Sequence, residues 1–450
     1  MITNKKIERS EHACVKLTVT VEKAAVKKEY DELIDKYSKS VQLKGFRKGK
    51  VPAEVLIRKF GSSLLEETAE KIIHKSLEEA FQDMEEQPLP FSVPRLDSEE
   101  ELKLDGDYTY TVSFDVYPEF SLPEYKGLEY EKMQVSITKD DLERELKALQ
   151  EQNSLVVDKQ DPVIAKGDIV NLNYCELNEA GEELENTRRE NFVFEVGTGY
   201  NLYKIDEEVL GLTPEDEKVI RKTLPEDFQP AELAGKDLTL KIKINSVKEK
   251  KLPEINDELA QDISDKYETL EDLKKDIRAR LKSFADSKVR ENSVSQLLDK
   301  VVEAAEIDLP QSMIERDLDL QWQNLLARFQ GNEQFLLEQL KQENKSKEEF
   351  LTEMKPASER RIKLQLLVGK MVETEKIEIS EEEKDAQIRK EAEARKVSFE
   401  DAKASLSQNN YLEYLTQDMK NEKLYDLLLE GAAAKKGKSV KFLDLAQTNY

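Results

Sequence analysis

Hydrophobic and polar positions either alternate or recur with a helical period along residues 1–117, and each pattern predicts an element. Residues 14–21 alternate between apolar and polar side chains, which is typical of a strand with one buried face. Apolar residues at three- and four-residue spacing predict helices over residues 26–41 and about 53–84. Residues 108–116 alternate again. We therefore expect a small α+β head in which two helices back a sheet.

Two details of this head are less regular. Gly61 interrupts the second helical pattern, and we expect a break or a kink there. Residues 102–104 are expected to begin a further strand before the turn at 105–107. The expected order is then strand, helix, loop, helix and strands.

The pattern becomes polar after residue 117 and then changes to short strands. Residues 118–155 form an extended piece followed by a polar helix, and we interpret them as a linker. Residues 156–250 contain short alternating runs and predict a compact β-rich insert. Its expected elements are strands at 169–177, 192–196, 219–224 and 238–247 and a short helix at about 205–210.

Residues 251–450 consist almost entirely of helix-forming residues. We expect Pro310 and Pro356 near the first turns of two long helices and Ser380 at the N-cap of another. No seven-residue repeat is sustained, so a long coiled coil is not expected. An ordinary helical bundle and a set of helical arms around an open crevice both fit this pattern. The basic stretch at 432–438 is expected to be a flexible tail.

Composition favours an elongated architecture over one compact globule. The 450 residues are 38% hydrophobic and 37% charged, so the core is thin for the length of the chain. Such a length suggests roughly two to four domains. The expected fold class is multidomain α+β, with an N-terminal α+β head, an inserted β-rich domain and an elongated all-α C-terminal body with helical arms.

Composition also excludes several classes of function. No run approaches the ~18 apolar residues of a membrane span, and the start of the chain has no apolar signal region. Cys14 and Cys175 are expected to be free thiols in a reducing cytoplasm. His12 and His74 are the only histidines, and no Cys/His cluster has metal-ligand spacing. We expect no metal, no cofactor and no Ser/His/Asp triad, and no nucleotide-binding motif is present.

One short stretch is basic, although the chain as a whole is acidic. Lys and Arg number 70 and Asp and Glu number 95, a net charge of −25, yet residues 42–53 contain no acidic residue. The cations of this stretch are Lys44, Arg47, Lys48 and Lys50. A solvated turn, a phosphate-binding P-loop and a docking tip for an anionic partner are the alternatives. The P-loop fails because the glycine spacing is wrong, a helix precedes the stretch, and Val51 replaces the Ser or Thr.

The same stretch carries a resemblance to a known family. Its pattern Gly-Phe-Arg-x-Gly-Lys-x-Pro resembles the ribosome-docking signature of the bacterial trigger factor family, chaperones that meet nascent chains at the exit tunnel. The ribosome-binding residues that the resemblance implies are Lys44, Gly45, Phe46, Arg47, Lys48, Gly49, Lys50 and Pro52. The implied partners are the ribosome, both protein and rRNA, nascent and unfolded polypeptides, and a second copy of the chain off the ribosome. The resemblance also implies a cytoplasmic chaperone that works without ATP.

The β-rich insert resembles a second known module, the FK506-binding-protein type of peptidyl-prolyl isomerase that trigger factors carry. The matching landmarks are Gly197-Thr198-Gly199, the run from Leu224 to Phe228, and Gly235-Lys236. The resemblance implies a pocket lined by Leu184, Glu185, Leu202, Ile205, Phe228 and Leu240.

The insert departs from the isomerase pattern at two places. Tyr203-Lys204 stands where the family has Pro-Gly, and of three usual aromatic positions only Phe228 is aromatic. We therefore expect weak isomerase activity, with a plain barrel core as the alternative. For the whole chain, the alternative to a ribosome-docking chaperone is a free isomerase whose helical region serves dimerisation or substrate tethering.

Overall fold

The structure is a computed structural model that describes residues 1–450 except 44–45, 47–48, 179, 226–232, 409–410 and 448–450. The chain divides into two compact units. The first comprises Met1–Lys132 and Asn292–Lys436, and the second comprises Met133–Glu291 and Gly437–Tyr450. None of the helices in this described part has the length and apolar composition needed to cross a lipid bilayer.

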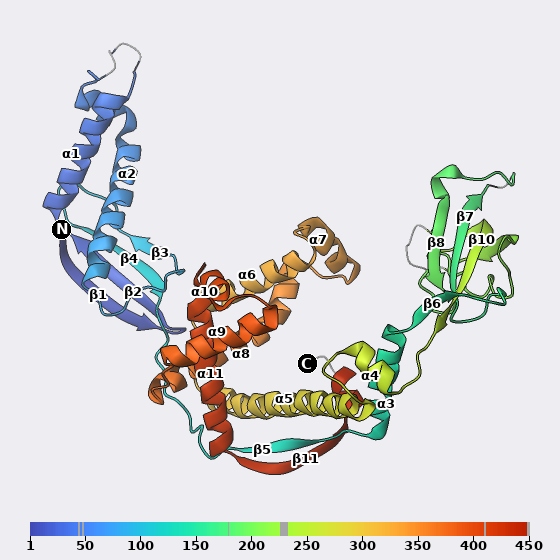
Figure 1. Ribbon diagram of the computed structural model, residues 1–450. Coiled ribbons are helices and arrows are strands. Elements are labelled where there is room, and N and C mark those ends of the chain that lie inside the picture. Colours follow the sequence, from blue (N-terminus) through green and yellow to red (C-terminus); the bar gives the residue numbers. More distant parts are fainter. Residues whose placement is uncertain (44–45, 47–48, 179, 226–232, 409–410, 448–450) are drawn as a thin grey trace. The chain divides into compact units, whose positions relative to one another are not determined.

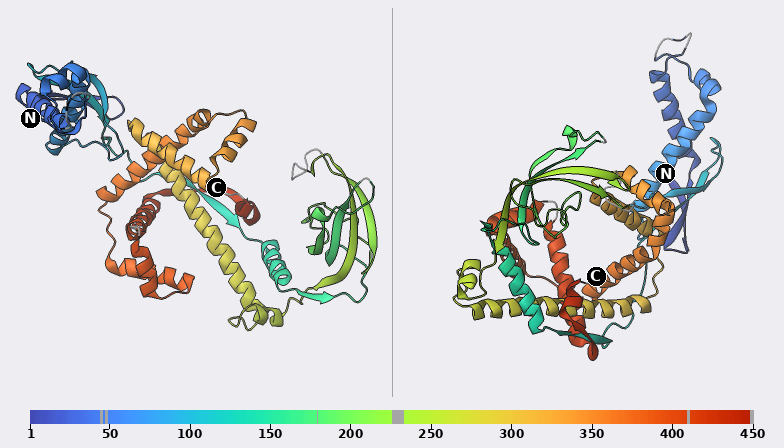
Figure 2. Two further views of the ribbon diagram at one scale, coloured as in Figure 1. Left: turned by 90° about the horizontal axis from the view of Figure 1, so that it is seen from above. Right: turned by 90° about the vertical axis from the view of Figure 1, so that its right-hand side faces the viewer.

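The head of the first unit is a four-stranded antiparallel sheet with two long helices, which lie side by side in all views (Figures 1 and 2). The strand order is β1-β2-β4-β3. The elements are β1 (Ile2–Ser10), β2 (Cys14–Val21), α1 (Lys23–Ser40), α2 (Ala53–Gln82), β3 (Arg95–Glu99) and β4 (Tyr108–Asp115). The alternating residues of β2 and β4 are buried together, with Leu17 opposite Val112, and Ile72 of α2 packs in the same core. Burying each such side chain stabilises the head by about 1.5–3 kcal/mol.

Of the two predictions for the irregular parts of the head, the kink is confirmed and the strand is wrong. Phe60 has non-helical backbone angles (φ −128°, ψ 16°), so α2 is kinked directly before Gly61, as predicted. The expected strand at 102–104 is wrong, because β3 lies at Arg95–Glu99 and all of its residues are exposed. No pattern predicts β1 either. Both are edge strands that pair through their backbones without burying a complete face, so no alternation marks them.

A buried carboxylate connects the head to the helical part of the same unit. Asp115 lies at the end of β4, and its Oδ2 accepts a hydrogen bond from the backbone N–H of Ser312 at 2.9 Å. Ser312 is in the first turn of α6 (Gln311–Arg328), whose N-cap residue is a proline without a side-chain cap. The carboxylate therefore satisfies one of the free N–H groups of α6 and lies at the positive end of the helix dipole.

We expect the substitution Asp115→Ala to lower the free energy of unfolding by about 1–2 kcal/mol, because it leaves this N–H group of α6 unpaired. Urea unfolding followed by circular dichroism measures the effect. Asp105→Ala, which removes an exposed carboxylate of the same head, is the control. Equal stability of the two variants would show that the Asp115 contact contributes nothing.

The helical part of the first unit has one main core. It is formed by α6 together with α5 (Leu270–Ala304), α8 (Lys347–Thr374) and α11 (Tyr411–Gly431). Leu367 and Met371 of α8 and Leu424 of α11 are fully buried in it. Tyr130, from the stretch expected to be a linker, is also buried in this core. Part of the stretch that we interpreted as a linker therefore packs against the helices of the first unit.

The position of Pro356 differs from the prediction. We expected a helix to begin near this proline, but α8 begins at Lys347 and Pro356 lies inside it. Ser346 and Glu349 form a capping box at the true start: the Ser346 Oγ accepts from the Glu349 N–H, and the Glu349 side chain accepts from the Ser346 N–H. The cap and the buried residues further along α8 outweigh the one backbone hydrogen bond that an interior proline removes.

Two smaller helical clusters have separate cores, which fits the expected arms. One contains α7 (Glu333–Gln342) with the end of α6 and the start of α8, around buried Trp322. The other contains α9 (Glu381–Arg395), α10 (Phe399–Ser407) and the first half of α11. Ser380 caps α9 with a capping box, as predicted.

A charged contact between α9 and α11 makes the second arm sensitive to pH. A hydrogen bond from Lys423 and one from the Ser380 backbone lower the pKa of Glu383 to about 2, from an ordinary value of 4.5. The folded value lies below the unfolded one, so ionised Glu383 stabilises the arm above pH 4.5. This contribution is lost as the pH falls from 4.5 towards about 2.

We therefore expect Glu383→Gln to reduce the loss of thermal stability that the wild-type chain shows on acidification through this window. Thermal unfolding followed by circular dichroism, at neutral pH and near pH 3, measures the difference. Glu382→Gln, a change at the exposed neighbouring residue, is the matched control. An identical acid response in the Glu383 variant and the wild type would contradict the assignment.

The β-rich insert lies in the second unit and forms a five-stranded antiparallel sheet (Figure 1). The order is β6-β10-β7-β8, and β9 also pairs with β10. The strands are β6 (Leu155–Asp158), β7 (Ile169–Leu177), β8 (Arg189–Glu195), β9 (Glu217–Thr223) and β10 (Asp237–Lys251). Alternating residues of β7 and β10, such as Leu172 and Ile244, are fully buried, which confirms the predicted strands.

The short helix expected at about 205–210 is wrong, because these residues form turns. The Oδ1 atom of Asp206 accepts hydrogen bonds from the backbone N–H groups of Gly197 at 2.7 Å and Gly199 at 3.1 Å. Its Oδ2 atom accepts one from Asn201 Nδ2 at 2.6 Å. These three bonds hold the segment in a loop, which is the local alternative to a helix that Asp offers the backbone.

The second unit also contains helices. It contains α3 (Lys139–Gln152), α4 (Asp257–Ile263), the first part of α5 and α12 (Phe442–Gln447). Leu142 and Leu146 of α3 share one core with Phe442 and Leu445 of α12. The predicted helix in the linker is thus confirmed, and its apolar stripe contributes to a core.

The flexible tail expected at 432–438 is wrong. Residues 433–438 belong to β11 (Ala433–Lys441), which pairs with β5 (Glu129–Ser136) in a two-stranded sheet. Lys435 forms an ion pair with Glu129 across this sheet. A basic run pairs here because a partly acidic strand lies opposite it, and the sequence near 432 contains no sign of that distant partner.

Candidate functional site

The basic loop lies between the end of α1 and the start of α2. Its base is held by buried side chains: Leu43 and Val51 pack in a core between the two helices. The Ser38 hydroxyl donates a hydrogen bond to the Val51 carbonyl at 2.7 Å. Gly49 has a φ of +78°, a left-handed conformation that favours glycine. The base of the loop is therefore fixed by α1 and α2 rather than by the loop itself.

Phe46 is on the surface. Its side chain is 38% exposed, and its backbone N–H donates to the Leu43 carbonyl at 3.0 Å. Lys50 is exposed, and Pro52 is the N-cap residue of α2. Of the other residues predicted for ribosome binding, Lys44, Gly45, Arg47 and Lys48 lie outside the described residues. An aromatic side chain and a cation of this loop are thus both exposed.

The residues predicted for the isomerase pocket are in two environments. Ile205 and Leu240 are each 1% exposed and belong to the same core of the insert. Leu184 is half-buried, whereas Leu202 and Glu185, in the 3-10 turn Glu185–Thr187, are exposed. Phe228 lies outside the described residues. The structure therefore brings Ile205 and Leu240 together and leaves Glu185 and Leu202 at the surface.

An aromatic cluster that sequence reasoning missed lies in the same core. Tyr174 makes edge-on contacts with Tyr203, at 5.4 Å between ring centroids, and with Phe192, at 5.5 Å. Tyr203 is buried, and its hydroxyl donates a hydrogen bond to Glu176 Oε1 at 2.6 Å. Burial, and next the bond to Glu176, raise the pKa of Tyr203. The alternation of β7 and β8 marks Tyr174 and Phe192 as inward-facing, but no pattern marks Tyr203.

The arms of the first unit expose several large apolar side chains. They are Leu320, Phe335, Val397, Tyr411 and Tyr414. The cores of the two arms are small. Exposed apolar side chains surrounded by charge are suited to weak contacts with unfolded polypeptides.

Comparison with known proteins places this architecture in a family. The family models described as "Bacterial trigger factor protein (TF)" and its C-terminus match residues 3–149 and 269–430. The chain is 34% identical over 444 residues to the trigger factor of Treponema denticola, covering 98% of each chain. It is 32% identical over 445 residues to that of Borrelia turicatae, covering 99% of this chain and 98% of the relative.

A solved structure has a similar fold over most of the chain. It is described as "Promiscuous Substrate Recognition in Folding and Assembly Activities of the Trigger Factor Chaperone". The match has a TM-score of 0.55 at 24% identity and covers 95% of this chain and 99% of the solved one. With both family models and full-length relatives in agreement, the chain belongs to the bacterial trigger factor family of ribosome-associated chaperones.

Proposed function

We propose that the loop at residues 44–52 docks the chain on the ribosome near the exit tunnel. The observation that carries this proposal is the exposure of Phe46 at the end of two helices, on a base fixed by Leu43 and Val51. A chain with a net charge of −25 repels RNA over most of its surface. Screening limits that repulsion to about 8 Å at physiological salt, so a local group of cations can act alone.

The charged and the aromatic residues of the loop have different roles in docking. Lys44, Arg47, Lys48 and Lys50 provide contacts to the phosphates of rRNA. Phe46 provides an apolar contact with a ribosomal protein, because an exposed aromatic ring gains most from entering a pocket. We also assign Gly45, Gly49 and Pro52 to the docking loop; Gly49 has a positive φ, and Pro52 is the N-cap residue of α2.

While docked, the chain holds nascent polypeptides in an open state without ATP. The exposed apolar residues of the arms make many weak contacts rather than one tight one, so clients dissociate without an energy source. The excess of acidic residues keeps a complex with an unfolded client soluble.

We assign residues 1–117 to ribosome binding, 118–155 to a linker, 156–250 to an isomerase and 251–450 to client binding. We assign the chain to the cytoplasm, where the ribosomes are. Off the ribosome, we assign it the form of a homodimer.

The insert has a second, weak activity: cis/trans isomerisation of prolyl bonds. Amide resonance sets a barrier of about 18–20 kcal/mol, and an apolar site that binds the twisted bond best lowers it. We assign this site to Leu184, Glu185, Leu202, Ile205, Phe228 and Leu240. The burial of Ile205 and Leu240 leaves them little contact with a proline ring, which is why we expect slow turnover.

We expect a protease-coupled assay on a short prolyl peptide to show a rate above the uncatalysed one only at high protein concentration. Tyr174→Ala, which removes the centre of the aromatic cluster, is expected to abolish even this rate. Val219→Ala, a change at an exposed position of the same sheet, is the control. A wild-type rate equal to the rate in buffer alone would contradict the isomerase activity. It would not affect the proposal that the loop docks on the ribosome.

A further inference from the structure

One side chain in the interior of the insert has no counterpart in the isomerase pattern. Tyr203 stands where that pattern has proline, and its side chain is only 4% exposed. The large side chains just before it lie at the surface, because Tyr200 is 86% exposed and Leu202 is 43% exposed. Of the three large side chains of this loop, only the Tyr203 ring therefore lies in the interior.

The Tyr203 ring shares its core with residues that we assign to the isomerase pocket. Tyr203, Ile205 and Leu240 belong to one cluster of buried side chains in the insert. The ring also lies edge-on to Tyr174, with 5.4 Å between the ring centroids and 87° between the ring planes. Protein interiors are close-packed and leave few voids as large as a side chain. A proline ring can therefore enter this core only where another side chain leaves it.

A hydrogen bond holds the Tyr203 ring in this position. The hydroxyl donates to Glu176 Oε1 at 2.6 Å, so the one polar group of the ring has a partner. A buried tyrosine is stable when its ring is packed and its hydroxyl is bonded, and Tyr203 meets both conditions. We therefore expect the ring to occupy the interior in most molecules.

The backbone next to Tyr203 is strained and is held by two lysines. Lys204 has a φ of +53°, a left-handed conformation that favours glycine, and glycine is the residue of the isomerase pattern at this position. Lys204 Nζ donates to the Gly199 carbonyl, and Lys222 Nζ donates to the Lys204 carbonyl. Strain of this kind persists only where the surrounding contacts impose it, and it is common at switches and ligand sites.

We propose that the Tyr203 side chain occupies the proline site of the insert, and that a prolyl segment binds only after the ring swings out. The inference rests on the proposed isomerase activity and names the residue that limits it. A site that is open in about a tenth of the molecules loses about tenfold in apparent affinity, however well its open form fits the substrate. Slow turnover then follows from the closed position of one side chain.

The first test measures isomerisation by the full-length chain in the protease-coupled assay. Tyr203→Ala removes the ring and should raise kcat/KM for a short prolyl peptide about tenfold above the wild type. Tyr203→Phe removes only the hydroxyl, and it should raise the rate less than Tyr203→Ala does, because a ring still fills the core. Tyr200→Ala removes an exposed tyrosine of the same loop and should not raise the rate.

A second variant covers the case in which Tyr203→Ala does not fold. Tyr203→Pro combined with Lys204→Gly gives the loop the residues of the isomerase pattern and removes the strain at position 204. The same increase in kcat/KM is expected from this double variant. Circular dichroism shows which variants are folded.

A third measurement follows the ring itself and does not depend on catalysis. Fluorotyrosine at position 203 of the otherwise unchanged chain gives one fluorine NMR signal, which reports the surroundings of the ring. An excess of the prolyl peptide should shift this signal towards that of fluorotyrosine at the exposed position 200. The same peptide with alanine in place of proline should leave the signal unchanged.

The outcomes separate this inference from the isomerase activity. An increase in the two ring-free variants supports the inference, even where the wild type is inactive. If the wild type exceeds the rate in buffer and neither ring-free variant exceeds the wild type, the inference is overturned and the isomerase activity stands. A fluorine signal that stays unchanged while the peptide is isomerised also overturns it. If the wild type and both ring-free variants stay at the uncatalysed rate, the isomerase activity fails and the inference fails with it.

Discussion

Replacing Phe46, Arg47 and Lys48 with alanine is expected to abolish co-sedimentation of the chain with ribosomes. The change removes two of the four loop cations and the exposed aromatic ring. Loss of two phosphate contacts and one apolar anchor should weaken binding by about two orders of magnitude at physiological salt. The head should remain folded, because Leu43 and Val51, which fix the base of the loop, are unchanged.

A matched control isolates the loop from the charge of the head. Lys27→Ala, Lys28→Ala and Ile57→Ala together also remove two cations and one exposed apolar side chain, but from the helix surfaces. This variant should pellet with ribosomes as the wild type does. If both triple variants bind equally well, the docking role of the loop is lost. Repeating the assay over a range of salt should show that the loop variant has a shallower salt dependence, by about two phosphate contacts.

The second large effect is expected from removing the insert. Asp158 of β6 lies opposite Lys248 of β10, and the antiparallel pairing continues to Leu155 and Lys251. A two-residue Asn-Gly turn can therefore join Asp158 to Lys248 in place of residues 159–247. The core of the insert contains only residues from within the deleted segment, so the deletion removes nothing from the other cores.

We expect this shortened chain to fold and to suppress aggregation of a proline-poor client almost as well as the wild type. Prolyl isomerisation should fall to the uncatalysed rate. Light scattering of the client and the protease-coupled assay measure the two activities on the same preparations. A folded deletion variant that no longer suppresses aggregation would instead support the free isomerase, with the helical region as a tether.

The elements that sequence reasoning predicted are those with one buried face. β2, β4, β7 and β10 alternate because each covers a core, and the kink at Gly61 and the cap at Ser380 follow from local chemistry. β1, β3 and β11 could not be found in this way, because they pair through their backbones and leave most side chains exposed. The helix around Pro356 was mispredicted because distant packing outweighs a local rule.

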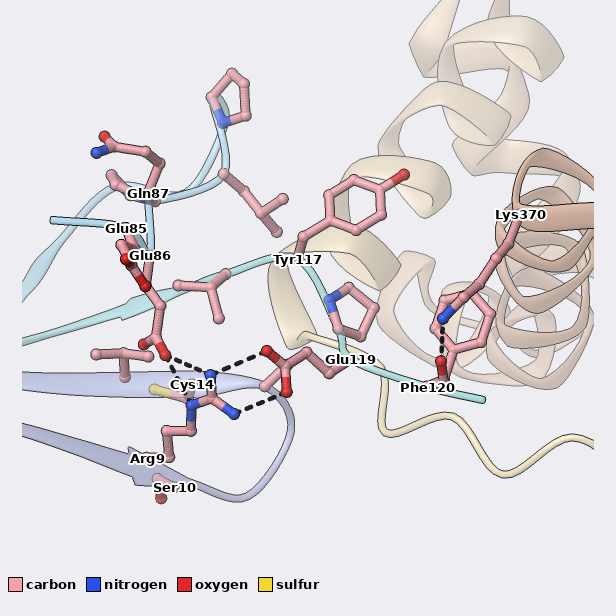
Figure 3. A pocket seen from close by; sticks show the side chains of 17 residues that line it. Arg9, Ser10, Cys14, Glu85, Glu86, Gln87, Tyr117, Glu119, Phe120 and Lys370 are labelled. Carbon is pink, nitrogen blue, oxygen red and sulfur yellow. Dashed lines mark hydrogen bonds and ion pairs between the residues drawn. The ribbon is translucent and has the colours of Figure 1, made fainter. Parts of the chain in front are cut away.

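At the candidate sites, too, local features could be predicted from the sequence and features that depend on distant residues could not. The basic loop is visible in the sequence because its charge and glycines are local features. The burial of Tyr203 beside Tyr174 depends on residues far apart in the chain. A cavity of the head, lined by Arg9, Glu86 and Glu119 (Figure 3), likewise joins three separate segments, and no single stretch indicates it.

Photo-cross-linking from position 46 tests the docking claim most directly. A benzoylphenylalanine that replaces Phe46 keeps an aromatic ring at the loop, and irradiation with purified ribosomes identifies what the ring contacts. The account predicts cross-links to large-subunit components at the tunnel exit from position 46 and none from position 57. Ribosomal cross-links from position 57, with none from position 46, would contradict it.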